Sequence, residues 1–401
     1  MTFHVPTVDI AAYVDDGAPE ARARVAQQID DACRTVGFIQ ITGHGIPNAV
    51  IRGLTEAMDA FFALDFERKK TWRTPPEINR GYTPPKSESL SLSLGVESAN
   101  RMNDFFEAFN IGAGQSAYPD APGLPQPDYA ENVWPDVAGF EAGVSAYFAE
   151  AARVARTMTR IFADALGLAP GFFAERTGHS LDVMRMNNYA LPPGTDVTLD
   201  GDLIGMGEHT DYGIVTILWA DQVAGLQVLG ADGSWNDVQP ADGALLINLG
   251  DVTARWTNER WLSTLHRVKP PVIDGTIQRR RSAAFFHDGD VDAVIRTLPS
   301  CVDAQHPDLY EPVTIGEHIR AKLAGSRLAC ATPPRSARAR ACSRAAAERA
   351  DTREPPLSAR NSGSSAARRP LRATKRRFGL HFARVRASAS RRDVKRGRVD
   401  R

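Results

Sequence analysis

The feature that most restricts the fold is a series of short β-rich runs that fills the chain after about residue 180. The runs are VMRMNNYA (183–190), IVTILWA (214–220), GLQVL (225–229), ALLINLG (244–250), HRVKPP (266–271) and RSAAFF (281–286). Turn-forming segments such as ADGS (231–234) separate them, and no helical pattern lies between them. Many short strands without intervening helices predict an antiparallel sandwich or barrel and argue against a parallel α/β sheet.

The first half of the chain has a helical pattern instead. Residues 19–36 place apolar side chains on one face at a period of about 3.6, and a second such pattern begins after Pro47. A third runs over about 136–166 and is followed by Gly167, a residue that commonly ends a helix. The run FIQIT (38–42) predicts a strand between the first two helices. The expected fold class is therefore mainly β with flanking helices and a helical N-terminal region.

The charge distribution divides the chain sharply, although the 48 Lys and Arg balance the 48 Asp and Glu overall. Residues 327–401 hold 22 basic and 5 acidic residues, a net charge of +17, so residues 1–326 carry −17. The tail is rich in Arg, Ala and Ser and has no apolar period, which predicts disorder because little surface could be buried. We expect an N-terminal region at 1–120, a core at 121–326 and a tail at 327–401. The abrupt change resembles a frame-shifted, GC-rich reading frame.

Composition also bears on location. No run of about 18 apolar residues is present, so no membrane-spanning helix is expected. The N-terminus lacks the basic and then apolar pattern of a secretory signal. Four scattered cysteines do not suggest a disulfide framework. Together these features predict a cytoplasmic protein, and they leave its oligomeric state open.

The strongest chemical signal is GEHTDYG (207–213). His209 and Asp211 alternate in a β context, so their side chains point to the same side and could bind one metal ion. His266 lies in another predicted strand, with 54 residues between it and Asp211, and could supply a third ligand. Two histidines and one carboxylate on one face of an octahedral iron(II) leave the other face open for substrate and dioxygen.

The pair alone does not settle the matter, because His-x-Asp also occurs at His306 and Asp308. We assign that second pair to a loop, since it lacks flanking glycines and a downstream histidine in a strand. For the pair at 209 and 211, the alternative is a hydrogen-bonded surface pair.

A second group of polar residues predicts a carboxylate receptor. In a strand, Arg280 and Ser282 share one face, and a guanidinium with a nearby hydroxyl can bind a carboxylate. Asn187 and Tyr189 share a face in the run at 183–190 and can also donate hydrogen bonds. The alternatives are an exposed basic strand end for the first pair and core packing for the tyrosine.

Together these motifs resemble the isopenicillin N synthase-like iron(II)/2-oxoglutarate-dependent oxygenases. The likeness runs in order from about residue 4 to 325 through VPTVDI, GFIQITGHGIP, N-x-Y, H-x-D, GLQVL, INLGD, WTNERWLSTLHRV and R-x-S. The resemblance implies a double-stranded β-helix, or jelly-roll, core with helices outside. It implies that His209, Asp211 and His266 bind Fe(II), and that 2-oxoglutarate and O2 are cosubstrates. The far carboxylate of 2-oxoglutarate would meet Arg280 and Ser282, with Asn187 and Tyr189 as further contacts.

The resemblance also suggests a function and pocket residues. We expect oxidation of a C–H bond in a small organic substrate, as in secondary metabolism, coupled to decarboxylation of 2-oxoglutarate to succinate. Family members often line the substrate pocket with the segment at 101–110, and other pocket residues could follow the R-x-S strand. The substrate candidates are Arg101, Asn103, Phe105, Phe285 and His287. One of Phe285 and Phe286 should line the pocket and the other pack in the core, and His287 with Asp288 could face the substrate or form a surface turn.

Two alternatives remain. In isopenicillin N synthase the R-x-S pair binds a substrate carboxylate, so an oxidative cyclase independent of 2-oxoglutarate is possible; Asn187 and Tyr189 favour the 2-oxoglutarate users. In a different class, the basic tail could bind nucleic acid through phosphate contacts. That tail has only Phe378 and Phe382 as aromatic residues for base stacking, so specific nucleic-acid recognition is not expected.

Overall fold

The structure is a computed structural model that describes residues 3–85, 106–190, 205–273 and 276–328. The substrate candidates Arg101, Asn103 and Phe105 lie outside the described residues. The predicted disordered tail also lies outside them, except that the last described helix continues to Leu328, two residues past the expected boundary at 326.

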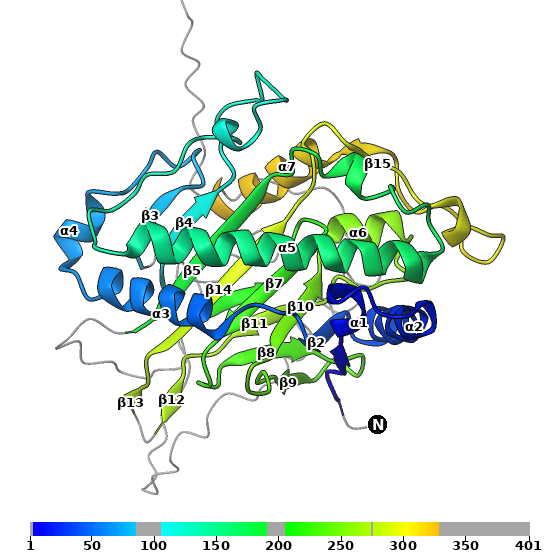
Figure 1. Ribbon diagram of the computed structural model, residues 1–401, viewed down its shortest axis with the longest axis horizontal. Coiled ribbons are helices and arrows are strands. Elements are labelled where there is room, and N and C mark those ends of the chain that lie inside the picture. The colour runs from blue at the N-terminus through cyan, green and yellow to red at the C-terminus, as the bar shows by residue number, and fades with distance from the viewer. Residues whose placement is uncertain (1–2, 86–105, 191–204, 274–275, 329–401) are drawn as a thin grey trace, which may run out of the picture. The chain divides into compact units, whose positions relative to one another are not determined.

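Two β-sheets form the centre of the described chain (Figure 1). The large sheet has the strand order β1 (Thr7–Asp9), β2 (Phe38–Thr42), β10 (Leu245–Leu249), β7 (Val215–Ala220), β14 (Arg280–His287), β5 (Asp182–Tyr189), β4 (Glu107–Gly112) and β3 (Gly81–Thr83). The small sheet has the order β6 (Met206–His209), β11 (His266–Val268), β8 (Leu226–Leu229) and β9 (Trp235–Asp237). Among the described strands, only β1 and β2 pair in parallel, so the predicted antiparallel architecture is confirmed.

Two short antiparallel pairs of strands lie outside these sheets. They are β12 (Val272–Ile273) with β13 (Thr276–Ile277), and β15 (Val294–Ile295) with β16 (Val313–Thr314).

Helices cover the large sheet. The α-helices are α1 (Ala11–Val14), α2 (Pro19–Thr35), α3 (Asn48–Phe62), α4 (Phe66–Lys70), α5 (Phe140–Leu166), α6 (Asp251–Trp256) and α7 (Ile315–Leu328). Short 3-10 turns are η2 (Gln115–Ala117), η3 (Ala174–Arg176) and η4 (Pro299–Cys301). The helices predicted at 19–36 and after Pro47 correspond to α2 and α3.

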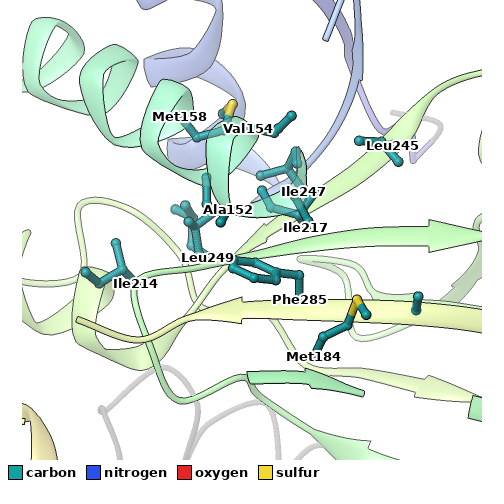
Figure 2. Packing of buried hydrophobic residues seen from close by; sticks show 14 of the residues in the cluster. Ala152, Val154, Met158, Met184, Ile214, Ile217, Leu245, Ile247, Leu249 and Phe285 are labelled. Carbon is teal, nitrogen blue, oxygen red and sulfur yellow. The ribbon is translucent and has the colours of Figure 1, made fainter. Parts of the chain in front are cut away.

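The long helix α5 packs across the large sheet and buries its apolar face there (Figure 1). It begins at Phe140, four residues later than predicted, because Gly139 takes a left-handed conformation (φ 74°) that interrupts helical geometry. It ends at Gly167, also left-handed at φ 64°, whose N–H bonds back to the last turn. Figure 2 shows Val154 and Met158 of α5 above Ile217, Ile247 and Phe285 of the sheet.

The alternation of side chains along β14 separates this core from a cavity on the opposite face of the large sheet. Ala283 and Phe285 are buried in the core under α5. Arg280, Ser282 and their alternate neighbours instead line the cavity, which strands of the small sheet also line. The cavity therefore has walls from both sheets.

The helix α7 completes the described fold. Ile315 and Ile319 are buried in the core, and Ile319 and Leu323 also line the cavity. Lys322 is buried and forms an ion pair with Asp251 of α6, with Nζ 2.6 Å from Oδ2. The helix is thus an integral part of the structure.

We expect a chain that ends after Leu328 to keep the melting temperature of the full chain, because α7 remains whole. A chain that ends after Thr314 loses the burial of Ile315 and Ile319 and leaves Asp251 without its cation, so its Tm should fall by on the order of 10 °C. Thermal unfolding followed by circular dichroism checks both. Failure of the chain ending at Leu328 to fold would show that later residues have a structural role.

Candidate metal centre and cavity

Three predicted ligands meet at one point. His209 ends β6 and His266 begins β11, where the two residues are direct cross-strand partners, and Asp211 follows in the loop after β6. Oδ1 of Asp211 lies 3.8 Å from Nε2 of His209 and 3.7 Å from Nε2 of His266. Two metal–ligand bonds of about 2.1 Å span up to roughly 4.2 Å, so one ion can bridge Asp211 to either histidine. The ligand atoms of the three residues all lie within 4.8 Å of one another, close enough to hold a metal ion together. All three side chains are buried.

The histidine rings are oriented by backbone carbonyls. Nδ1 of His209 lies 2.7 Å from the oxygen of Gly207, and Nδ1 of His266 lies 3.1 Å from that of Thr264. When Nδ1 donates its proton to a carbonyl, the lone pair of Nε2 is free to bind a metal ion. Burial, reinforced by the nearby His266, lowers the pKa of His209 to about 4, so its ring is neutral at neutral pH, as a metal ligand must be.

Asp211 is oriented by two residues that were not assigned a role from the sequence. Its Oδ2 accepts hydrogen bonds from Oγ1 of Thr216, at 2.5 Å, and from Nδ2 of Asn248, at 2.6 Å. These donors leave Oδ1 to face the two histidines. Asn248 belongs to the INLGD motif, so its position was recognised, but the sequence alone does not show which side chain it contacts.

Asp251 links residues 210–213, here called the metal loop, to the helix α7. Its backbone N–H donates to the carbonyl oxygen of Asp211, and its Oδ2 accepts from Oγ1 of Thr210 at 3.2 Å and pairs with Lys322. Burial acts to raise the pKa of Asp251, but Lys322 and His318 outweigh it and hold this pKa below its ordinary value. Thr210, between the two predicted ligands of the H-x-D motif, is therefore connected to α7 through Asp251.

A cavity of about 160 Å³ opens beside the three ligands. At one end, β14 and β5 pair Arg280 with Tyr189 and Ser282 with Asn187. Nη1 of Arg280 and Nδ2 of Asn187 both lie 3.4 Å from Oγ of Ser282. The four residues predicted to form a carboxylate receptor are thus adjacent and line the cavity.

The charge of Arg280 has no counterpart in the described residues. Its side chain is only 2% exposed, and no described carboxylate forms an ion pair with it. Its Nε and Oδ1 of Asn187 also have no hydrogen-bond partner among the described residues. Burial of an unpaired guanidinium is costly, so an anionic ligand in the cavity would supply a missing partner. The donor set fits a carboxylate.

Two predicted substrate contacts are corrected by the structure. Phe285 is fully buried in the core, with its ring 5.0 Å from that of Phe148 of α5. His287 lies on the same core-facing side, with Nδ1 2.8 Å from Oδ1 of Asp182. The cavity is lined instead by Phe286 and Asp288. The prediction chose the wrong face of β14. Both faces of this strand are buried, so the apolar character of its residues did not show which face lines the cavity.

Other lining residues extend the cavity beyond the three ligands. They include Arg185, whose guanidinium lies 4.9 Å from the ring of Phe106, and Asn110, Tyr212 and Ile319. Asp288 is also buried, and this burial, with Asp182 and Asp211 nearby, raises the pKa of its carboxyl well above its ordinary value.

The other His-x-Asp pair is placed as predicted. His306 and Asp308 lie in an exposed loop, where His306 interacts with Asp303. A separate group of His179, Asp290 and Asp292 reaches the surface, and its imidazole is already hydrogen-bonded to Asp292 at 2.8 Å. In the described part of the chain, only the group at 209, 211 and 266 is wholly buried.

Comparison with known proteins identifies the relatives of this chain. Residues 5–137 match the family described as non-haem dioxygenase in morphine synthesis N-terminal, and residues 181–289 match the 2OG-Fe(II) oxygenase superfamily. The 2-oxoglutarate-Fe(II) type oxidoreductase hxnY of Emericella nidulans is 34% identical over 319 residues, covering 79% of this chain and 88% of that protein. Validamycin A dioxygenase of Streptomyces hygroscopicus subsp. limoneus is 32% identical over 309 residues, covering 75% and 81%.

Solved structures agree with these matches. Full-length T7H of Neurospora crassa, in complex with alpha-KG and thymine, has a TM-score of 0.68 and 26% identity, covering 80% of this chain and 96% of that one. The dioxygenase for auxin oxidation of rice has a TM-score of 0.59 and 25% identity, covering 80% and 95%.

The chain therefore belongs to the 2-oxoglutarate-Fe(II) oxygenase family. It is a dioxygenase that uses Fe(II), 2-oxoglutarate and O2 to oxidise a small organic substrate, which confirms the predicted function and cosubstrates. The comparisons do not favour the oxidative cyclase. Among the described helices, none is long and apolar enough to cross a membrane.

The contacts to Asp211 generate a prediction for metal affinity. Thr216→Val keeps the shape of the side chain but removes one donor to Oδ2, so the carboxylate is less well oriented. We expect Fe(II) or Mn(II) to bind about 10- to 100-fold more weakly, as measured by calorimetric titration. Thr157→Val, which removes a buried hydroxyl in α5 that bonds only to the Arg153 carbonyl, is the matched control and should keep wild-type affinity. Equal affinity of Thr216→Val and wild type would refute this role.

Proposed function

We propose that His209, Asp211 and His266 are the Fe(II) ligands of this oxygenase. The observation that carries the proposal is the convergence of two Nε2 atoms on one carboxylate oxygen, at 3.7 and 3.8 Å from it, at a buried wall of the cavity. Two neutral imidazoles and one carboxylate leave a single positive charge on a divalent ion, which favours an anionic cosubstrate. Three protein ligands also leave positions open for cosubstrate and O2.

The second part of the proposal assigns the carboxylate receptor. Arg280 and Ser282 bind the far carboxylate of 2-oxoglutarate, and Asn187 and Tyr189 complete the site from β5. The buried, uncompensated guanidinium of Arg280 supports this assignment, since the cosubstrate supplies the opposite charge. The ring of Tyr189, 5.2 Å from Cζ of Arg280, limits the orientations that the guanidinium can take.

The remaining chemistry follows from these positions. Fe(II) with 2-oxoglutarate and O2 supplies the oxidising power that hydroxylates a C–H bond or oxidises it in another way. The protein holds the iron through two imidazoles and one oriented carboxylate, binds the cosubstrate at Arg280 and keeps the substrate in the cavity beside them. We infer that 121–326 form the jelly-roll core of the oxygenase and that 1–120 form its N-terminal region. We also infer that the protein is cytoplasmic. Unpaired Cys33 and Cys301 fit a reducing compartment.

The metal assignment predicts a specific pattern of losses. His266→Ala removes one ligand, so Fe(II) occupancy should fall sharply and succinate formation from 2-oxoglutarate should cease. His306→Ala, in the exposed pair, should retain the metal content and activity of the wild type. Metal analysis of both purified variants, together with succinate assays, checks the prediction. Wild-type metal content in His266→Ala would exclude this residue as a ligand.

Arg280→Leu separates the dioxygenase from the oxidative cyclase. Loss of the guanidinium leaves the far carboxylate of 2-oxoglutarate without its partner, at a cost on the order of 2–5 kcal/mol. The KM for 2-oxoglutarate should rise by more than about tenfold while Fe(II) binding is retained. Arg281→Leu, on the opposite face and paired with Asp59 and Asp221, is the control. Oxygen consumption by the wild type without 2-oxoglutarate would favour the cyclase.

A further inference from the structure

We propose that Asp288 is a specificity-determining residue whose carboxylate binds a hydrogen-bond-donating nitrogen of the substrate, preferably a protonated amine. The inference rests on the proposed function, since it concerns the substrate end of the same cavity. It narrows the substrate class from any small organic molecule to one with a basic nitrogen next to an apolar body.

Asp288 lies at the end of the cavity opposite Arg280. Alternate residues of β14 line the cavity from Arg280 through Ser282 and Phe286, and Asp288 continues this row just past the end of the strand. Eight residues of extended chain span about 26 Å, far more than the length of 2-oxoglutarate. Asp288 is therefore too distant from Arg280 to share its ligand and is placed where a substrate would lie.

The carboxylate of Asp288 lacks the partners that other buried carboxylates have. Glu107 pairs with Lys69 at 2.7 Å, Asp182 with His287 at 2.8 Å, and Asp30 with Arg34 at 2.8 Å. Of the buried carboxylates in the described ranges, Asp288 alone has neither a hydrogen bond nor an ion pair, although it is only 9% exposed.

The charges that act on Asp288 are also negative. They come from Asp182 and Asp211. The carboxylate of Asp182 contacts His287, and that of Asp211 faces the proposed iron. Neither residue therefore brings a positive group to Asp288. Arg185, the arginine on the neighbouring strand, is paired across the sheet with Ala284 and stacks on Phe106. A positive group in the cavity would therefore find its complement at Asp288.

The position of Asp288 is fixed by its neighbours. His287 is bonded to Asp182, and the N–H of Gly289 donates to Oγ of Ser180 at 2.9 Å. Ser180 in turn donates to Asp182 at 2.6 Å, so both residues that flank Asp288 belong to one network. On the other side, a Cβ at Gly213 would lie 1.8 Å from Oδ1 of Asp288, so only glycine allows the carboxyl to approach the metal loop. The acceptor is thus oriented before a ligand binds.

Apolar side chains form much of the wall beside Asp288, although the same cavity is also lined by Arg80 and Arg185. Phe286, Leu181 and Val183 lie beside it along the paired strands, and Ile319 and Leu323 of α7 also line this cavity. A second acceptor lies further along, because Oδ1 of the buried Asn110 has no hydrogen-bond partner among the described residues. Apolar walls with acceptors fit a compact apolar body that carries a donor nitrogen.

Three single-ring probes test the inference: benzylamine, benzyl alcohol and benzoate. The full chain, loaded with Fe(II) and 2-oxoglutarate under nitrogen, is titrated with each by calorimetry. Wild-type protein should bind benzylamine most tightly and benzoate most weakly. In Asp288→Asn the affinity for benzylamine should fall by about tenfold or more, while that for benzyl alcohol changes much less.

Controls separate this inference from the proposed function. Asp292→Asn removes a nearby carboxylate outside the cavity and should keep the wild-type order of probes. If Asp288→Asn does not fold, Asp288→Ser provides a smaller uncharged replacement with the same expected loss. Equal benzylamine affinity in wild type and variant, a preference for benzoate, or no binding of benzylamine would overturn the inference. Loss of 2-oxoglutarate binding in the same wild-type preparation would instead contradict the proposed cosubstrate site.

Discussion

One carboxylate joins the two sheets of this protein. Oδ2 of Asp211 accepts hydrogen bonds from Thr216 in β7 and Asn248 in β10, both in the large sheet. Oδ1 faces His209 and His266, which belong to β6 and β11 of the small sheet. The position of the metal centre therefore depends on the register of the paired strands within each sheet. A shift of one residue in a strand that carries one of these groups would separate the ligands.

Two buried ionisable side chains without ionic partners among the described residues line the cavity. Arg280 and Asp288 lie on the same face of one chain segment, and neither has an ionic partner in the described part of the protein. Such groups reduce the stability of the empty protein, but they give a ligand with the opposite charge a large advantage over water. Arg280 and Asp288 would therefore bind two different molecules within the same cavity.

Much of the architecture could be predicted because alternation and helical periodicity are local properties of the sequence. The strand pairing of N-x-Y with R-x-S, and the convergence of His209, Asp211 and His266, agree with the positions expected. The parity of Phe285 and Phe286 could not be predicted, since both faces of β14 are buried. The roles of Thr216 and Asn248 depend on contacts with Asp211 that no local pattern reveals. The start of α5 depended on one left-handed glycine.

The contribution of α7 has a consequence for synthesis of the protein. Translation proceeds from the N-terminus, so this helix is the last described element to leave the ribosome. Until then Asp251 has no Lys322 to neutralise it, and the cavity lacks the wall formed by Ile319 and Leu323. In a nascent chain that already contains all three proposed iron ligands, the cavity is therefore still open on the side that α7 covers. Iron bound at that stage would lie in a site accessible to water. Emergence of α7 from the ribosome, more than synthesis of the three ligands, therefore sets the time at which the oxidising centre becomes enclosed.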